Sequence, residues 1–288
     1  MDDVVEVRRF TRLVTQRVGV LNDHYLARDR PLGEARVLWE IGDGVDVREL
    51  RRRLDLDSGY VSRLLRALEA AGLVTVSPSP ADGRVRVAAL TPEGQAERAI
   101  LDTRADALAE SLLAPLNARQ RTRLVDAMRE VDRLLTAGLV KVAVTDPAHP
   151  DARHCLDAYF AELNTRFETG FDESKGISAT GDELREPAGL LLVATLHEEP
   201  VGCGALRLGE YAQIKRMWVA DSVRGLGIGR RLLSELEEQA RSHGARAVRL
   251  ETNRTLTEAI GMYRAAGYEE VAPFNDEHYA HHWFEKRL

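Results

Sequence analysis

The chain has 288 residues, enough for two domains of ordinary size. Its 44% apolar and 30% charged residues suit packed cores with a solvated surface. No stretch approaches the ~18 consecutive apolar residues of a membrane helix. The first residues, Met-Asp-Asp-Val-Val-Glu, are acidic overall and lack the basic start of a secretory signal peptide. With only two cysteines, Cys155 and Cys203, these features predict a cytoplasmic protein with no membrane partner, disulfide framework or metal site.

The net charge of −6 is unevenly distributed along the chain. Residues 1–140 contain 22 arginines, no lysine and 22 acidic residues, whereas residues 141–288 contain 18 basic and 24 acidic residues. A neutral first part can still bind DNA if its arginines gather on one face. The arginine bias fits a GC-rich genome equally well.

The first part begins with a series of predicted helices. Residues 3–27 place apolar side chains at helical spacing, and a second helix is expected from Pro31. A short helix over residues 47–54 precedes another helix that Asp57 or Ser58 can cap. A short helix, a tight turn and a second helix form a helix-turn-helix unit.

The chain then changes from helical to strand-like spacing. Residues 73–76 and 84–87 are predicted strands, joined by a turn rich in Ser, Pro, Asp and Gly at residues 77–83. A β-hairpin directly after the second helix makes a winged helix-turn-helix. Long helices are expected over residues 91–113 and 117–135.

These segments resemble the MarR family of transcriptional regulators over about residues 3–137. The resemblance is carried by PLGEARVLWEIG, LDSGYVSRLLRALEAAGLV and SPADGRVRVAALTPEG. It implies a homodimer formed by the first and last helices, and therefore a palindromic operator on duplex DNA. It also implies a recognition helix in the major groove and a wing arginine, Arg84, that is held by Asp82 and reaches a minor groove. The implied DNA-binding residues are Ser58, Tyr60, Ser62, Arg63, Arg66, Asp82 and Arg84.

A domain boundary is expected near residue 138, which gives a first domain of residues 1–138 and a second of residues 139–288. The second domain is expected to combine strands and helices around an irregular stretch at residues 165–188. Its predicted strands are 139–144, 189–196, 200–207, 212–219, 247–251, one from Tyr268 and one near 282–287. Its predicted helices are 151–164, one from the glycine-rich segment to about His243, and 257–266.

The glycine-rich segment Arg-Gly-Leu-Gly-Ile-Gly at residues 224–229 lies between a predicted strand and a predicted helix. Glycines let successive backbone N–H groups turn toward one anion, and a helix N-terminus adds a partial positive charge. The segment therefore predicts a phosphate-binding loop.

The second domain resembles the GNAT superfamily of N-acetyltransferases over about residues 139–288. The resemblance is carried by AQIKRMWVADSVRGLGIGRRLL and TEAIGMYRAAGYEEV. It implies an α+β fold with a central, mainly antiparallel sheet, acetyl-CoA as the cofactor, and acetyl transfer to a primary amine, expected on a small molecule. The implied cofactor-binding residues are Met217, Trp218, Val219, Arg224, Gly225, Leu226, Gly227, Ile228, Gly229, Arg230, Asn253 and Tyr263.

By the same resemblance, Tyr263 is the acid that protonates the leaving thiolate. Two departures from the family leave the general base open. Leu256 stands where many GNAT enzymes have Asn, and residues 211–220 contain no acidic side chain. The candidate bases are Glu162, Glu210, Glu251 and His282, or a water molecule.

An aromatic segment around residues 158–171 lies where GNAT proteins shape the acceptor pocket. Arg166 could receive an acceptor carboxylate through two parallel hydrogen bonds, but an exposed arginine on a core helix fits the pattern equally well. The candidate substrate-binding residues are Tyr159, Glu162, Arg166 and Phe171.

Three functions are compatible with the sequence. The leading one is a bifunctional protein, a MarR-like regulator joined to a GNAT acetyltransferase. The second is a regulator that senses acetyl-CoA or an amine without turnover, which Leu256 and the missing acidic residue favour. The third is an enzyme whose winged helix serves only dimerisation and protein contacts. If both sites work, the helix ending near Leu135 could couple them.

Overall fold

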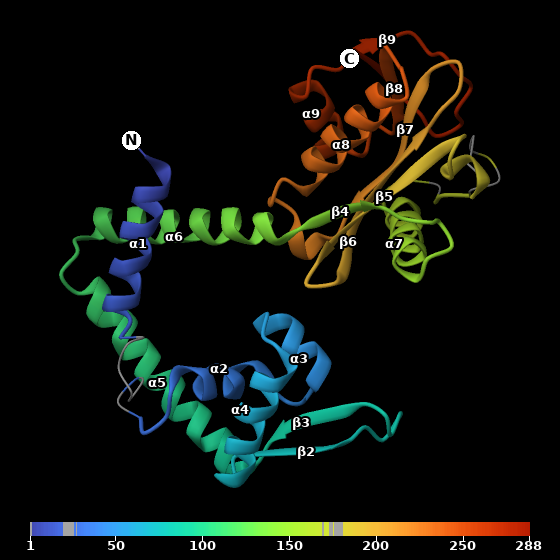
Figure 1. The fold of residues 1–288 in the computed structure, drawn as a ribbon. Helices are drawn as coiled ribbons and strands as arrows, with labels where there is room; N and C mark the ends of the chain where they lie inside the picture. Colours follow the sequence, from blue (N-terminus) through green and yellow to red (C-terminus); the bar gives the residue numbers. More distant parts are fainter. Residues whose placement is uncertain (1, 20–25, 27, 169, 173–174, 176–180) are drawn as a thin grey trace. The chain divides into compact units, whose positions relative to one another are not determined.

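The computed structural model describes residues 2–19, 26, 28–168, 170–172, 175 and 181–288. The chain folds as two compact units, residues 1–127 and 128–288 (Figure 1). No helix among these described residues is long and apolar enough to cross a membrane.

The first unit is mostly helical and contains one small antiparallel sheet, with the strand order β1-β3-β2. Its elements are α1 (Asp3–Arg17), α2 (Leu32–Ile41), β1 (Val45–Asp46), α3 (Val47–Leu54), α4 (Ser58–Ala70), β2 (Val74–Pro78), β3 (Arg86–Leu90), α5 (Pro92–Leu113) and the first half of α6 (Ala118–Leu139).

Local sequence explains why these helices begin where they do. The Asp57 carboxylate accepts a hydrogen bond from the backbone N–H of Tyr60, which caps α4. Thr91 caps α5 in the same way, with Pro92 at the first helical position. The core beneath them is apolar and fully buried, and it positions α4 against the hairpin. Its largest members are Leu38, Ile41, Leu50, Leu68 and Leu101.

The second unit is an α+β fold around a seven-stranded sheet with the order β4-β5-β6-β7-β8-β10-β9. Its strands are β4 (Lys141–Val144), β5 (Gly189–Leu196), β6 (Glu199–Arg207), β7 (Ala212–Val219), β8 (Ala247–Thr252), β9 (Glu269–Val271) and β10 (His282–Arg287). Its remaining helices are α7 (Pro150–Arg166), η3 (Asp182–Leu184), η4 (Asp221–Val223), α8 (Ile228–Ser242) and α9 (Thr257–Ala265).

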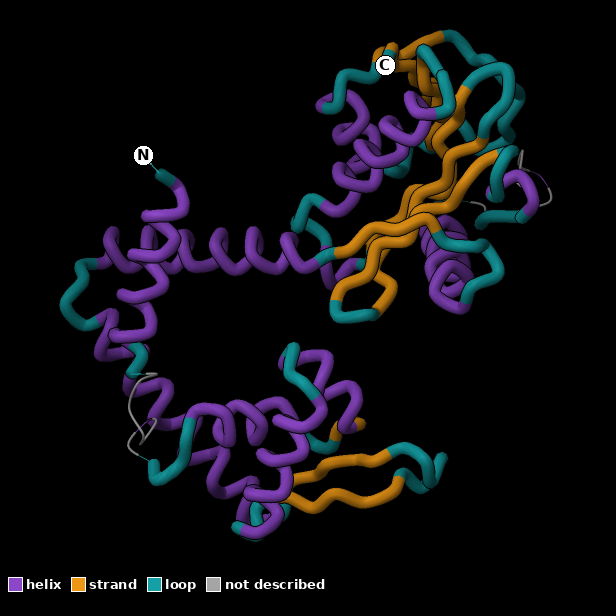
Figure 2. The backbone as a smooth tube through the Cα atoms, in the orientation of Figure 1, coloured by secondary structure: helices purple, strands orange, loops and turns teal. Residues whose placement is uncertain are grey.

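Helices cover both faces of this sheet (Figures 1 and 2). Alternate residues of β5 point to opposite faces, as the two-residue period of a strand requires. Leu190 and Leu192 join the core under α8 and α9, whereas Leu191 and Val193 join the core under α7. The predicted fold class is therefore confirmed.

One strand pair, β7 and β8, is parallel, and these two strands separate beyond a short paired stretch. β7 pairs with β8 only at Ala212 and Gln213, and every other neighbouring pair in the sheet is antiparallel. Beyond Gln213 the two strands are no longer joined by ladder hydrogen bonds. The resulting wedge can be filled by side chains or by a ligand.

Several predicted element bounds differ from the structure. Strand β3 spans Arg86–Leu90, not residues 84–87, and two long helices also differ. Helix α1 ends at Arg17, not near residue 27, because Gly19 adopts a positive φ of 71° that ends the helical path. Residues 20–25 and 27 of that prediction lie outside the described residues, as do 169, 173–174 and 176–180 of the irregular stretch. Helix α6 continues to Leu139, so β4 begins at Lys141. The boundary near residue 138 stays a prediction.

Candidate functional site

The glycine loop joins η4 to α8 and has a backbone that favours glycine. Gly225 and Gly227 have φ angles of 84° and 81°, in the left-handed region that other residues rarely adopt. The first intrahelical bond of α8 runs from the N–H of Arg231 to the carbonyl of Gly227. The N–H groups of the preceding turn therefore have no acceptor within the helix and are suited to bind an anion.

A groove of about 440 Å³ lies between this loop, β7, α7 and α9. Ten of the twelve predicted cofactor residues line it: Met217, Trp218, Val219, Arg224, Gly225, Gly227, Ile228, Gly229, Arg230 and Tyr263. The other two predicted residues, Leu226 and Asn253, do not line it. Leu226 packs against the core, and the Asn253 amide bonds the backbone of Thr255 and Tyr279. Positive φ glycines, an arginine and an apolar wall fit a long cofactor with a diphosphate.

A smaller cavity of about 120 Å³ lies beside the groove and has aromatic walls. The centroid of the Phe171 ring lies 5.6 Å from that of Phe160 and 5.0 Å from that of Tyr279. Phe167 packs against both Phe171 and Tyr279. Some residues line both the aromatic cavity and the groove and so form the boundary between them. The shared residues are Tyr159, Leu163, Met217, Leu256, Ala259 and Tyr263.

A β-bulge in β7 lies at the same junction. Cys203 pairs with Trp218 and Ala205 with Lys215, so Arg216 and Met217 together face one residue of β6. Arg216 has a positive φ of 55° and places its guanidinium 5.1 Å from the centroid of the Phe160 ring. A bulge removes backbone groups from the ladder, so the backbone beside Met217 can offer an N–H to a ligand.

The helix expected to contact DNA is built in the first unit as predicted from sequence. Helix α4 buries Val61, Leu64, Leu65 and Leu68. The opposite face leaves the five predicted DNA-binding residues of the helix exposed, namely Ser58, Tyr60, Ser62, Arg63 and Arg66. The guanidinium of Arg63 lies 5.4 Å from the ring centroid of Tyr60.

The turn of the wing is also exposed, and its aspartate bonds the backbone of the turn. The Asp82 carboxylate accepts a hydrogen bond of 3.0 Å from the backbone N–H of Arg84, and the Asp82 carbonyl accepts one from Val85. A carboxylate in a turn commonly bonds backbone N–H groups of this kind. Asp82 therefore stabilises the turn, and its expected contact with the Arg84 guanidinium stays a prediction.

Comparisons with known proteins match both parts of the chain. Residues 152–268 match the model of the acetyltransferase (GNAT) family, and residues 29–85 match that of the MarR family. The chain carries a MarR-family region and a GNAT acetyltransferase domain.

Individual relatives match one part each. An IAA acetyltransferase of Azospirillum brasilense is 40% identical over 94 residues, 32% of this chain and 61% of that protein. YdgJ, an HTH-type transcriptional regulator of Bacillus subtilis, is 27% identical over 86 residues, 30% of this chain and 52% of that protein. A GNAT-family acetyltransferase structure from Staphylococcus aureus is 16% identical, covers 52% of this chain and 99% of that one, and has a TM-score of 0.45. The chain thus spans less than two thirds of the length of these two sequence relatives.

Within the GNAT domain, Tyr263 lies at the junction of the groove and the aromatic cavity. Its side chain is 5% exposed. Burial raises the pKa of its phenol well above the ordinary value, and the nearby charge of Glu251 raises it further. A phenol is protonated at neutral pH even at its ordinary pKa, so the Tyr263 hydroxyl is available as a hydrogen-bond donor there. The raised pKa extends this protonated form to higher pH.

Glu251 on β8 lines the aromatic cavity and is 6% exposed. Lys215 on β7 forms an ion pair with its Oε1 atom. The Oε2 atom is buried, and none of the described residues donates a hydrogen bond to it. A buried oxygen without a donor is costly, so this atom is suited to a ligand N–H.

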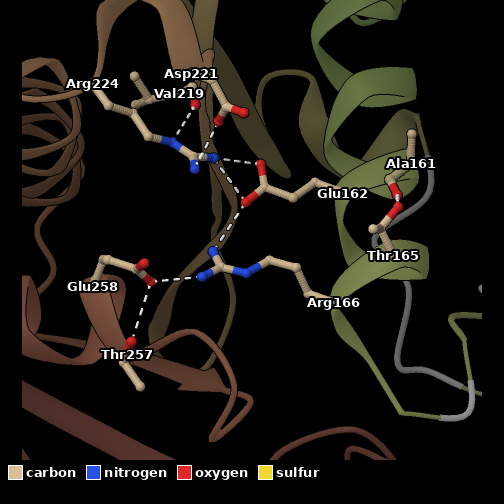
Figure 3. Close-up of polar contacts among 9 residues, drawn as sticks. All are labelled: Ala161, Glu162, Thr165, Arg166, Val219, Asp221, Arg224, Thr257 and Glu258. Carbon is tan, nitrogen blue, oxygen red and sulfur yellow. Dashed lines mark hydrogen bonds and ion pairs between the residues drawn. The ribbon is translucent and has the colours of Figure 1, made fainter.

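The other three candidate bases lie elsewhere or are already paired. Glu162 lines the groove and pairs with Arg166 and Arg224 (Figure 3). Glu210 lines a different cavity, and His282 lies 2.6 Å from Glu270 and lines neither the groove nor the aromatic cavity. Of the four candidates, only Glu251 lines the aromatic cavity.

Of the predicted acceptor-binding residues, Tyr159 lines both cavities and Phe171 the aromatic one. Arg166 lines only the groove, where it pairs with Glu162 and with Glu258. Glu258 and Lys215 are site residues that sequence reasoning missed. Their partners are 92 and 36 residues away in the chain, and no local pattern indicates such a pair.

No cluster of His, Cys, Asp and Glu in the described part of the chain could hold a metal ion. Cys155 and Cys203 are both free and buried.

Proposed function

We propose that the GNAT domain transfers an acetyl group from acetyl-CoA to a primary amine of a small molecule, and that the MarR-like region binds DNA as a dimer. The observation that carries the enzymatic part is the meeting of two cavities at Tyr263, beside Glu251 and the glycine loop. A narrow aromatic cavity of about 120 Å³ suits a small planar or apolar acceptor better than a folded protein surface.

The groove is suited to acetyl-CoA, which would supply the acetyl group. The N–H groups of the first turn of α8 and the side chain of Arg224 would bind the diphosphate. The edge of β7 at residues 217–219 would pair with the amide-containing arm. The backbone at the bulge beside Met217 would donate to the acyl oxygen, where negative charge develops.

Proton transfer would be divided between two buried side chains. The Oε2 atom of Glu251 would accept a proton from the acceptor ammonium group, while Lys215 holds the other carboxylate oxygen in place. Tyr263 would donate its phenolic proton to the leaving sulfur, because its side chain lines both the groove and the aromatic cavity. The acid and the base then act at the same junction.

DNA binding by a dimer is supported by two surfaces of the helical region. Exposed arginines and polar side chains on α4 and on the wing suit the major and minor grooves. Apolar side chains on α1 are exposed, including Val7 at 63%, Leu13 at 55% and Phe10 at 46%. Such a face is expected to be covered by a partner, and a second copy would give the symmetry that a palindromic operator requires.

A second candidate function is a sensor that binds acetyl-CoA or an amine without turnover. It is favoured by Leu256, which replaces a polar side chain of the family at a position lining both cavities.

The test is acetyl-CoA-dependent thiol release with a panel of primary amines, using the wild-type chain and Glu251→Gln. Turnover that the variant loses by about 100-fold or more, with CoA binding retained, would support the enzyme and its base. Binding of CoA without turnover on any amine would favour the sensor. Equal turnover by both proteins would contradict the role of Glu251. Glu238→Gln, a change of the same kind on the exposed face of α8, is the matched control.

A further inference from the structure

Four side chains form a continuous chain of ion pairs along the cofactor groove (Figure 3). Arg224 pairs with Glu162, Glu162 pairs with Arg166, and Arg166 pairs with Glu258. All four line the groove. They come from the glycine loop, from α7 and from α9, so the chain of ion pairs joins three of the elements that enclose the groove.

The first ion pair engages Arg224, the cation that we expect to bind the cofactor diphosphate. Arg224 Nη2 donates to both oxygens of Glu162, at 2.8 and 2.7 Å. The same guanidinium pairs with Asp221 through Nη1 and donates from Nε to the Val219 carbonyl. A guanidinium binds carboxylate and phosphate oxygens with the same geometry. Glu162 therefore takes up the group that a diphosphate would use.

The second half of the chain holds Glu162 in that place. Arg166 Nη1 donates to Glu162 Oε1 at 3.0 Å, and its Nη2 donates to Glu258 Oε2 at 2.8 Å. Thr257 also donates to the Glu258 carboxylate, which ties it to the start of α9. With Asp221, the cluster has three carboxylates and two guanidinium groups. The net charge of this cluster is −1, which repels an incoming anion. The anion can bind if one carboxylate gives up its ion pair with a guanidinium group.

We propose that Glu162 is an internal competitor for the cofactor diphosphate: it positions Arg224 at the groove and releases it when the phosphate groups bind. The inference rests on the proposed use of acetyl-CoA. Binding then replaces the Glu162–Arg224 pair with a phosphate–Arg224 pair, while Arg166 keeps the freed carboxylate neutralised. Glu162 thus sets the affinity for phosphate-bearing ligands and takes no part in proton transfer.

This role predicts an effect opposite to that of an ordinary binding residue. Removing the Glu162 charge should tighten CoA binding, because the diphosphate no longer displaces a carboxylate. The gain should be about two- to fivefold, since ion pairs that are partly exposed to solvent are weak. Pantetheine, which has no phosphate, should bind equally well to both proteins. A purely structural role for Glu162 would instead weaken both ligands.

The experiment is calorimetric titration of the full chain with CoA and with pantetheine. The proteins are wild type, Glu162→Gln, Arg224→Ala, the double variant, and Glu238→Gln as the matched control for a lost surface charge. We expect Glu162→Gln to bind CoA more tightly, the control to be unchanged, and the gain to vanish in the Arg224→Ala background. Glu258→Gln, at a position whose side chain is 70% exposed, should give a smaller gain.

If CoA binding is unchanged or weakened in both Glu162→Gln and Glu258→Gln, the inference about Glu162 is overturned, while the proposed function still stands. A gain that is equal for pantetheine, or that persists without Arg224, would overturn it as well. Failure of the wild-type chain to bind CoA at all would contradict the proposed function, and the inference with it.

Discussion

At the scale of single residues, the strongest prediction concerns Tyr263. Its hydroxyl is the only protic group we assign to the leaving sulfur, so Tyr263→Phe should lower kcat by about 100-fold or more. The CoA dissociation constant should stay unchanged, because the ring and its packing are kept. Steady-state kinetics and calorimetry would measure the two quantities. Tyr268→Phe, which removes a hydroxyl from a buried tyrosine outside both cavities, is the control.

The pKa of Tyr263 leads to a second prediction. A free tyrosine loses its proton near pH ~10, but burial and the charge of Glu251 raise the pKa of this phenol. The protonated, donating form is therefore kept at every pH below that raised value. We therefore expect that loss of the Tyr263 proton does not lower kcat between pH 8 and about pH 10. A basic limb in this range that the variant lacks would contradict the assignment.

Residues of the site differ in how well sequence could predict them. The glycine loop was predicted from a short local motif and Tyr263 from the GNAT resemblance. Both line the groove, and their roles stay predictions. Glu251 was one of four open candidates, because the choice among them depends on which of the four lines the aromatic cavity. Lys215 and Glu258 could not be found at all, since their partners are set by how β7 and α9 pack.

At the scale of secondary-structure elements, one ion pair ties the segment before α2 to α5. Arg28 donates through Nε and Nη2 to both oxygens of Glu97, at 2.9 and 2.5 Å. The Glu97 side chain is 7% exposed. The hydrogen bonds from Arg28 lower the pKa of Glu97, and the charge of Arg30 adds to this effect.

Glu97→Gln should therefore lower the free energy of unfolding of the first unit by about 1–3 kcal/mol at neutral pH. A carboxylate with a lowered pKa contributes stability above its ordinary value near ~4.3, and this contribution is lost as pH falls through the lowered folded pKa. The difference between wild type and variant should shrink below pH 4. Hydrogen exchange of the first unit would measure it, with Glu110→Gln on the same helix as control. A difference that is independent of pH would refute the ion pair as its cause.

Helix and strand types followed from sequence more reliably than their ends. The caps at Asp57 and Thr91 located the starts of α4 and α5 within a residue. The bulge in β7 left no sequence signal, because it depends on pairing with β6. The spacing of apolar residues also predicted too late an end for α1, because that spacing carries no information about the positive φ of Gly19.

At the scale of the whole molecule, the wing supports a prediction about DNA. Arg84→Ala should weaken binding to duplex DNA and reduce the slope of log K against log salt by about one, because one phosphate or groove contact is lost. Turnover of amines should not change. Fluorescence anisotropy at several salt concentrations would measure the slope. An unchanged affinity would refute the role of the wing, and loss of turnover would refute the independence of the two sites.

The last prediction concerns coupling between the two functions. Helix α6 begins in the first unit and ends in the second, where Arg133 Nη1 donates to the carbonyl of Gly225 in the glycine loop at 2.7 Å. A ligand that changes this loop therefore acts on a helix shared with the proposed dimer interface. We expect CoA to change DNA affinity, and DNA to change CoA affinity by the same factor, as linkage requires.

Arg133→Ala should reduce that factor toward one, because it removes the hydrogen bond between helix and loop. Arg123→Ala, on the same helix but in the first unit, should leave the ratio of affinities unchanged even if DNA binding itself weakens. Both affinities can be measured by titration with and without the other ligand. Equal affinities in the presence and absence of the second ligand would show that the two sites work independently. A coupling factor that survives in Arg133→Ala would mean that another path carries it.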